Sequence, residues 1–201
     1  MAAQAYRALI EPQRAIRMIG NTRTSWGWMS QAFHWIGAGF VLFLLIHGWW
    51  MTDFAPRAGR FEHYLWHASV GYGFLALMIL RLLWRWTNAV PALPSEMQAW
   101  QRIAAHVSHW GLYVLILAAS VSGWALAGTF SRPMNASLFG LVHVPGIVEG
   151  RSLHDRLEAS HSILAWALAI VFLVHFAAAL YHLLSLKDGV MQRMLPMEKE
   201  R

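Results

Sequence analysis

The chain has 201 residues, of which 57% are hydrophobic and only 13% are charged, and its mean hydropathy is +0.39. Soluble domains are about 45–50% apolar and about 25% charged, so this composition leaves too little charged surface for a water-soluble globule. The chain contains no cysteine, which excludes disulfides, thiolate metal sites, thiolate-held iron–sulfur clusters and cysteine nucleophiles.

Four long apolar stretches follow one another along the chain, each reaching about 20 residues, the length that spans a bilayer as a helix. The roughly ten-residue alternating strands of a membrane barrel are absent from the sequence. We therefore expect an all-α integral membrane protein, built as a four-helix bundle. The apolar stretches cover approximately residues 32–51, 64–86, 103–128 and 159–186. The expected domains are a basic N-terminal tail (1–31), the membrane bundle (32–186) and a C-terminal tail (187–201).

The lysines and arginines predict how the bundle is oriented. Eleven of the 16 cations fall in the two tails and the second connection, and five fall in the first and third connections, whereas the ten acidic residues divide five and five. Cytoplasmic segments carry the excess of Lys and Arg, so both termini are expected in the cytoplasm. The same rule explains the net charge of +6, so we expect contact with membrane lipid and no nucleic-acid partner. The third connection, about 130–158, contains FGLVHVPG and is expected to fold on the outer side.

Histidine is costly inside lipid unless it has a function, and several of the 11 histidines fall within the expected spans. The most informative spacing is that between His161 and His175. Fourteen residues turn a helix through about 1,400° and advance it by about 21 Å, so the two residues lie within about 40° of one face. Two imidazoles on one face, one near each side of the membrane, are typical of two stacked haems with two axial ligands each.

The depth of each histidine predicts its partner. The first span starts inside, which places His34 near the cytoplasmic side, and the second starts outside, which places His67 near the outer side. The fourth span also starts outside, so His161 is near the outer side and His175 near the cytoplasm. Cofactor sites in helix bundles are built from side chains on facing helices. We therefore expect His34 and His175 on an inner haem iron and His67 and His161 on an outer one.

Other interpretations of these histidines stay open at this point. A single intramembrane histidine often hydrogen-bonds a neighbouring helix. Zinc also binds imidazole, but it favours three or four ligands at one level, often with a carboxylate. The expected spans hold no Asp or Glu, which weakens both the zinc interpretation and a transporter's proton relay. A haem-free membrane scaffold or transporter remains the alternative from another functional class.

Four further side chains are expected near the cytoplasmic end of the bundle. Arg81 and Arg85 lie one helical turn apart in the second span, His109 opens the third, and His182 follows His175 by seven residues. They are candidates for contacts to haem propionates or to the head group of a quinone. The alternatives are snorkelling basic anchors and histidines that hydrogen-bond at helix interfaces.

Four blocks of the sequence resemble the bacterial cytochrome b561 family of four-helix, dihaem inner-membrane proteins. The resemblance implies a multi-pass protein of the bacterial inner membrane with two haem b groups. It also implies haem ligands at the positions of His34, His67, His161 and His175. The blocks are FHW at 33–35, HASVGYGFLALMILRLLWR at 67–85, AHVSHWGLYVLIL at 105–117 and HSILAWALAIVFLVHFAAALYHLLSLKDGVMQRMLP at 161–196.

The resemblance is greatest to family members that pass electrons from superoxide to ubiquinone. It implies transmembrane electron transfer with ubiquinone as the acceptor, and with superoxide or a redox partner protein as the donor. The alternative within redox chemistry is a membrane-anchoring cytochrome b subunit of a larger respiratory or hydrogenase-type complex. Because basic groups raise the encounter rate of an anion, Arg60, seven residues before His67, is the candidate for steering superoxide; no other catalytic residue is assigned.

Overall fold

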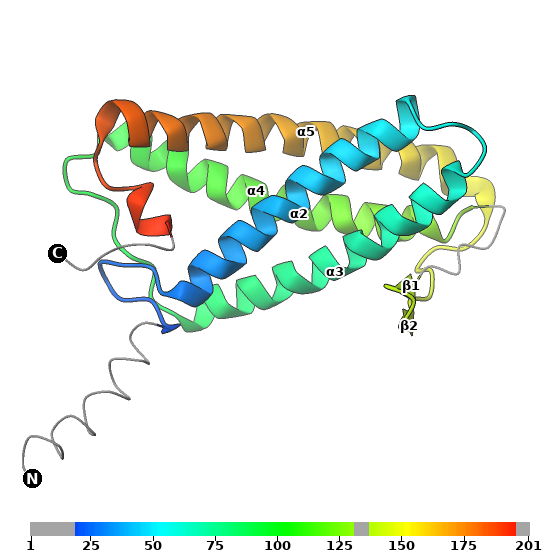
Figure 1. Ribbon diagram of the computed structural model, residues 1–201, viewed down its shortest axis with the longest axis horizontal. Helices are drawn as coiled ribbons and strands as arrows, with labels where there is room; N and C mark the ends of the chain where they lie inside the picture. The colour runs from blue at the N-terminus through cyan, green and yellow to red at the C-terminus, as the bar shows by residue number, and fades with distance from the viewer. Residues whose placement is uncertain (1–18, 131–136, 196–201) are drawn as a thin grey trace, which may run out of the picture.

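The computed structural model describes residues 19–130 and 137–195. Most of the expected N-terminal tail and the last six residues of the C-terminal tail therefore lie outside the described residues. Four long helices run side by side (Figure 1). They are α2 (Trp28–Asp53), α3 (Arg60–Thr87), α4 (Ala99–Ala127) and α5 (His154–Tyr181). The short elements are strands β1 (Ser137–Leu138) and β2 (Val142–His143), and the turns η1 (Arg151–Leu153), η2 (His182–Leu186, π-helical) and η3 (Gln192–Met194).

All four long helices are long and apolar enough to cross a membrane, which confirms the predicted all-α bundle. Each helix begins about one turn before its apolar stretch. The first turn is polar and continues the backbone hydrogen bonding of the helix into the head-group region. Helix α4, for example, starts with a capping box in which the side chains of Gln98 and Gln101 each bind the other's backbone. Hydropathy therefore locates the lipid-embedded part of each helix and not its ends.

The buried core is small and lies between α2, α3, α4 and α5. It contains Val41, Phe74, Met78, Ile116 and Leu168, and the rings of Phe40 and Phe74 stack 5.5 Å apart beside it. Most long apolar side chains face outward instead; on α5 these include Trp166, Ile170 and Val174, which are 59%, 61% and 60% exposed. An outer surface of this kind suits lipid rather than water.

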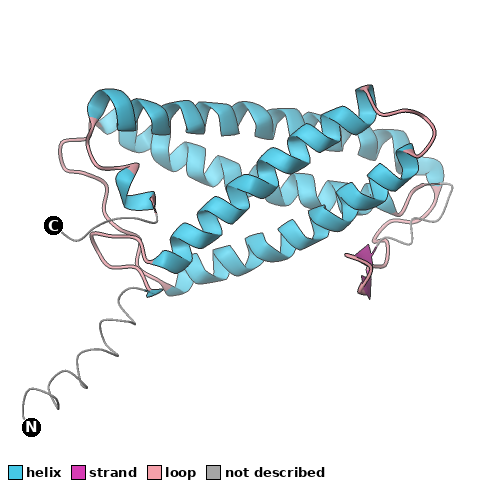
Figure 2. Ribbon diagram, viewed as in Figure 1, coloured by secondary structure: helices cyan, strands magenta, loops and turns pink. Residues whose placement is uncertain are grey.

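The described part of the third connection is folded, as predicted. Strands β1 and β2 pair antiparallel, and a turn at Phe139 and Gly140 with φ of 52° and 75° joins them. The hairpin is held against α3, because the amide of Phe139 donates to the hydroxyl of Ser69 at 2.7 Å and its ring packs on Gly73. Figure 2 places the two strands beside one end of the helices.

The described chain ends at the same end of the bundle at which it begins. Asn21 donates to the carbonyl of Ala89 at 2.8 Å, which holds the entry segment on the connection between α3 and α4. At the other terminus, Gln31 donates to the carbonyl of Arg193 at 3.1 Å and Trp35 to that of Met194 at 2.7 Å. An even number of membrane crossings requires this arrangement.

Candidate functional site

An inner group of histidines forms where three helices meet. The rings of His34 on α2 and His175 on α5 have centroids 6.2 Å apart and planes inclined at 63°. His109 on α4 brings a third ring to 5.3 Å from that of His175. From α3, the guanidinium of Arg81 donates to Nδ1 of His34 at 3.3 Å. The structure thus brings together four of the residues selected from the sequence at this end.

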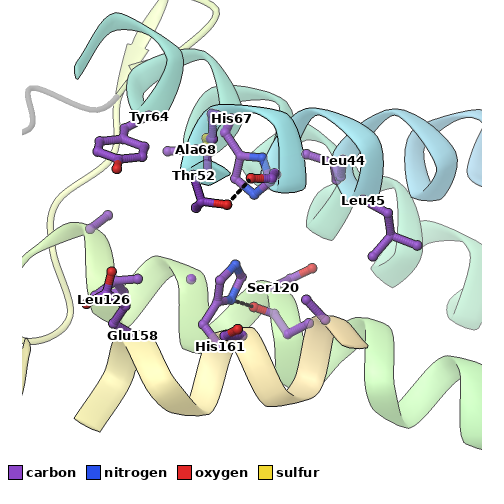
Figure 3. Close-up of a pocket in the computed structure, with 18 of the residues that line it drawn as sticks. Leu44, Leu45, Thr52, Tyr64, His67, Ala68, Ser120, Leu126, Glu158 and His161 are labelled. Atoms are coloured by element: carbon purple, nitrogen blue, oxygen red, sulfur yellow. Dashed lines mark hydrogen bonds between the residues drawn. The ribbon is translucent and has the colours of Figure 1, made fainter. Parts of the chain in front are cut away.

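An outer pair of histidines faces each other across a cavity near the opposite end (Figure 3). The ring centroids of His67 on α3 and His161 on α5 are 6.2 Å apart, and the planes are inclined at 86°. Nδ1 of His161 lies 3.0 Å from the carbonyl oxygen of Ala119 and 3.1 Å from the hydroxyl of Ser122. A carbonyl oxygen only accepts, so Nδ1 carries the proton and Nε2 keeps its lone pair for a metal.

The cavity between these two rings has a volume of about 1160 Å³. Pockets for small molecules and cofactors are typically about 300–1,000 Å³, so a porphyrin-sized group is within its capacity. All four long helices contribute to its wall, and the side chains are mainly apolar apart from a polar outer end. Figure 3 shows the two imidazoles approaching from α3 and α5 with open space between them.

Two glycines allow the outer rings to lie against neighbouring helices. A Cβ atom at Gly48 would come within 3.2 Å of Cε1 of His67, and one at Gly123 within 2.9 Å of Cε1 of His161. Gly71 also lines the cavity and has nothing within 4 Å of the position of its Cβ. The role of Gly48 cannot be predicted from the sequence, because glycine is common in membrane helices and only helix packing reveals which glycine faces a ring.

The spacing of both pairs fits an iron held between two imidazoles, provided that Arg81 releases Nδ1 of His34, because that bond leaves the proton of the neutral ring on Nε2. Imidazole nitrogen binds a metal at about 2 Å; the ring centroid lies about 1 Å behind the nitrogen, so two rings facing one ion have centroids about 6 Å apart. Both the inner and the outer pair have this spacing, 6.2 Å. Within the described residues, Nδ1 of His67 is buried without a hydrogen-bond partner, so no hydrogen bond at Nδ1 selects which ring nitrogen carries the proton.

The two arginines of α3 differ in what they reach. Arg81 lies over the ring of Tyr113 at 5.4 Å. A Cβ at Gly37 would be 3.3 Å from Nη1 of Arg81, so the glycine leaves room for this guanidinium to approach α2. Arg85 lies over the rings of Trp110 and Tyr113 at 5.6 and 5.7 Å. Arg81 therefore contacts His34 of the inner pair directly, and Arg85 extends the positive charge one turn further along α3.

The last two candidate residues bind partners that sequence reasoning did not anticipate. Nδ1 of His182 lies 2.5 Å from a carboxylate oxygen of Asp188, so the C-terminal segment closes back on the end of α5. Arg60 is the first residue of α3, and its Nε and Nη2 donate to the carbonyl of Ala55 at 3.2 and 2.5 Å. These bonds hold the guanidinium near the outer end of the bundle. They leave its positive charge in place, because a carbonyl acceptor is neutral.

Comparison with known proteins places both histidine pairs inside one extended match. The family model described as prokaryotic cytochrome b561 matches residues 25–197. Cytochrome b561 homolog 2 of Escherichia coli (strain K12) is 30% identical over 177 residues, which cover 87% of this chain and 93% of that protein. The probable superoxide oxidase CybB of Yersinia pestis is 31% identical over 169 residues, covering 83% and 93%. Cytochrome b561 homolog 1 of Escherichia coli (strain K12) is 28% identical over 172 residues, covering 83% and 94%. The chain therefore belongs to the prokaryotic cytochrome b561 family of bacterial membrane proteins, which bind haem b and transfer electrons across the membrane.

Proposed function

We propose that this protein oxidises superoxide at the outer face of the bacterial inner membrane and reduces ubiquinone at the cytoplasmic side through two haem b groups. The observation that carries the proposal is the pair of facing imidazoles at each end of the bundle, with the same centroid spacing of 6.2 Å. Helix α5 contributes one histidine to each pair, and 14 residues of helix separate these by about 21 Å. Electrons would thus pass through two haem groups between the two sides of the membrane.

In this proposal His67 and His161 hold the outer haem, and His34 and His175 hold the inner one. Haem b, when bound, supplies one-electron iron chemistry. The four imidazoles would hold, orient and bury the haem groups and would leave substrate no place to bind at the iron. The bond from His161 to Ala119 orients the ring and keeps Nε2 as the ligand atom.

Two features support superoxide as the donor at the outer end. One relative carries the name probable superoxide oxidase. In addition, the fixed guanidinium of Arg60 stands about two helical turns from His67 and supplies a positive charge that attracts an anion. Two superoxide anions lose one electron each and leave as O₂, while one ubiquinone takes up two electrons and two protons to become ubiquinol.

The inner cluster supports ubiquinone as the acceptor. Arg81 and His109 lie beside the inner histidine pair and offer hydrogen-bond donors to the carbonyl oxygens of a quinone head group or to a haem propionate. Arg85 and the His182–Asp188 pair add charged groups near the cytoplasmic end. In this orientation, the two protons that ubiquinol needs come from the cytoplasm.

Stopped-flow spectroscopy of the purified haem-loaded protein tests the proposal. Superoxide is expected to reduce the haem, and added ubiquinone to reoxidise it within the same reaction. Arg60→Gln and added salt should each slow the reduction several-fold, because both weaken electrostatic steering. Arg102→Gln, at the opposite end of the bundle, is the matched control and should leave the rate unchanged. A haem that superoxide does not reduce would overturn the proposal and favour a partner subunit as the donor.

A further inference from the structure

At the outer end of the cavity, three side chains of the first turns of α5 come together apart from the histidine pairs. A ring nitrogen of His154 and one carboxylate oxygen each of Asp155 and Glu158 lie within 4.8 Å of one another. All three residues line the cavity that contains His67 and His161. Acidic side chains in a first helical turn are common, because they favour the positive end of the helix dipole. The dipole does not explain the buried imidazole.

The surroundings of His154 select one tautomer of its neutral ring. It is only 8% exposed, and the ring of Phe130 packs edge-on against it at 4.9 Å. Its Nδ1 is 2.8 Å from the hydroxyl of Thr129, and that hydroxyl is 2.7 Å from the carbonyl oxygen of Leu126. The carbonyl only accepts, so the hydroxyl proton points to Leu126 and Thr129 accepts the Nδ1 proton of His154. In the neutral ring Nε2 is then an unprotonated lone pair.

The neutral ring thus offers one unprotonated nitrogen, and the exposed carboxylates of Asp155 and Glu158 beside the ring are acceptors as well. Among the described residues, the ring of His154 makes no ion pair with Asp155 or Glu158. The ring of His182, by contrast, lies 2.5 Å from a carboxylate oxygen of Asp188. Three metal-ligating groups this close together are able to share one cation. We propose that His154, Asp155 and Glu158 bind a divalent transition-metal ion, and that zinc fits best.

The ligand chemistry favours zinc over a hard cation. Imidazole together with carboxylate is a zinc donor set, and three protein ligands with one open position are typical of zinc sites that keep a water. Ligands at about 2 Å in a tetrahedron are about 3–4 Å apart, so the exposed carboxylates need only small rotations to close on the ion. Thr129 is 1% exposed, and its hydroxyl orients the ring from behind, as outer partners of metal-bound histidines do.

A cation at this position would change the charge at the outer end of the cavity. Three carboxylates line this region, those of Asp53, Asp155 and Glu158, with one arginine, Arg151. Their formal charges sum to two negative, which a divalent ion cancels. This consequence rests on the proposed function: a neutral entrance admits an anion such as superoxide more readily than a negative one.

Zinc titration of the full-length, haem-loaded protein in detergent, after treatment with a chelator, tests the site by calorimetry. Cobalt serves as the visible-absorption probe for a tetrahedral ion. We expect one ion per chain, bound at least about tenfold more weakly after Glu158→Gln or His154→Gln. Thr129→Val should weaken binding by about 10–100-fold, as loss of an outer partner does, and Thr129→Ser should restore it because it keeps the hydroxyl.

The matched control is Glu149→Gln, which removes an exposed carboxylate of the same connection outside the cluster. Equal zinc binding by the parent, Glu149→Gln and Glu158→Gln proteins would identify adventitious binding and overturn the site, as would the absence of a bound ion. Glu158 is exposed, so its variant tests the site even if His154→Gln fails to fold.

The rate of haem reduction by superoxide, with zinc and with chelator, separates this inference from the proposed function. A several-fold lower rate with chelator in the parent, but not in Glu158→Gln, is expected if both hold. Zinc binding without haem reduction in any form of the protein would overturn superoxide oxidation and leave the metal site standing. Haem reduction without zinc binding would overturn the metal site and leave superoxide oxidation standing.

Discussion

The imidazole of His161 is held from two sides. Its Nδ1 is hydrogen-bonded to the backbone of Ala119 at 3.0 Å and lies 3.1 Å from the hydroxyl of Ser122, while its carbon edge lies against Gly123. These contacts come from consecutive turns of α4, so this helix fixes both the direction and the tautomer of a ring that belongs to α5. A ring held in this way would need no rearrangement to ligate iron.

Gly123→Ala should displace the ring of His161, because the added Cβ would lie 2.9 Å from Cε1. Overpacking of this kind costs about 1–3 kcal/mol, and we expect loss of the outer haem with the inner haem retained. The haem-to-protein ratio and the low-spin signals in electron paramagnetic resonance measure this. Gly111→Ala on the same helix is the control, because nothing lies within 4 Å of its Cβ. Equal haem content in both variants would contradict the packing argument.

The pairing of histidines by depth makes a reciprocal prediction. His67→Ala should remove the outer haem and leave the inner one, and His34→Ala should do the opposite, because each pair occupies a different end of the bundle. Redox titration with optical spectra resolves the two haems. If a folded His67→Ala protein loses both haems together, the two pairs do not act as separate sites.

At the scale of single elements, the end of α5 shows the clearest departure from regular α-helical geometry. The α-helix changes to a π-helical turn at His182–Leu186, and Lys187 and Gly189 then adopt φ of 53° and 80°, which reverses the chain. The returning segment reaches α2 through the bonds from Gln31 and Trp35. The segment after α5 thus covers the end of the bundle that contains the inner histidines.

His182→Ala should slow reoxidation of the haem by ubiquinone and leave the haem spectrum nearly unchanged, because His182 binds Asp188 rather than the histidine pairs. Stopped-flow mixing of the reduced protein with ubiquinone measures the rate. His106→Ala is the control: His106 lies at the same end of the bundle and hydrogen-bonds the carbonyl of Arg102 in its own helix. Unaltered reoxidation would assign His182 to holding the C-terminal segment.

At the scale of the whole molecule, the four helices form one bundle whose ends differ in charge. Among the described residues, six of the ten cations lie at the end with the termini and the connection between α3 and α4. The end with the hairpin and the cavity mouth carries four described cations and five acidic residues. Because the more positive end is expected in the cytoplasm, we expect the outer histidine pair and the cavity to face the opposite side.

The absence of cysteine allows a direct test of this orientation. A membrane-impermeant maleimide should label Glu149→Cys in intact cells and Ser95→Cys only after the membrane is opened, because these exposed residues lie at opposite ends of the bundle. The cysteine-free parent gives the background. Labelling of Ser95→Cys in intact cells would reverse the assigned orientation and move the donor site to the other side.

The sequence by itself determined the number of spans, the helical class and the depth of each histidine. Length and hydropathy along a helix locate a residue in one dimension, and the period of 3.6 residues gives its face. The structure brings together the same histidine pairs that depth predicted, His34 with His175 and His67 with His161, although their ligation of iron stays a prediction.

Only the tertiary structure decided which groups support those histidines. Gly48 and Gly123 acquire their role from the rotation of α2 and α4 about their own axes, which no single helix encodes. The partner of His182 depends on the path of the chain after α5, and the cluster around His154 depends on how α4 ends at Thr129. Contacts between helices and connections depend on packing in three dimensions, whereas periodicity reports only on one helix at a time.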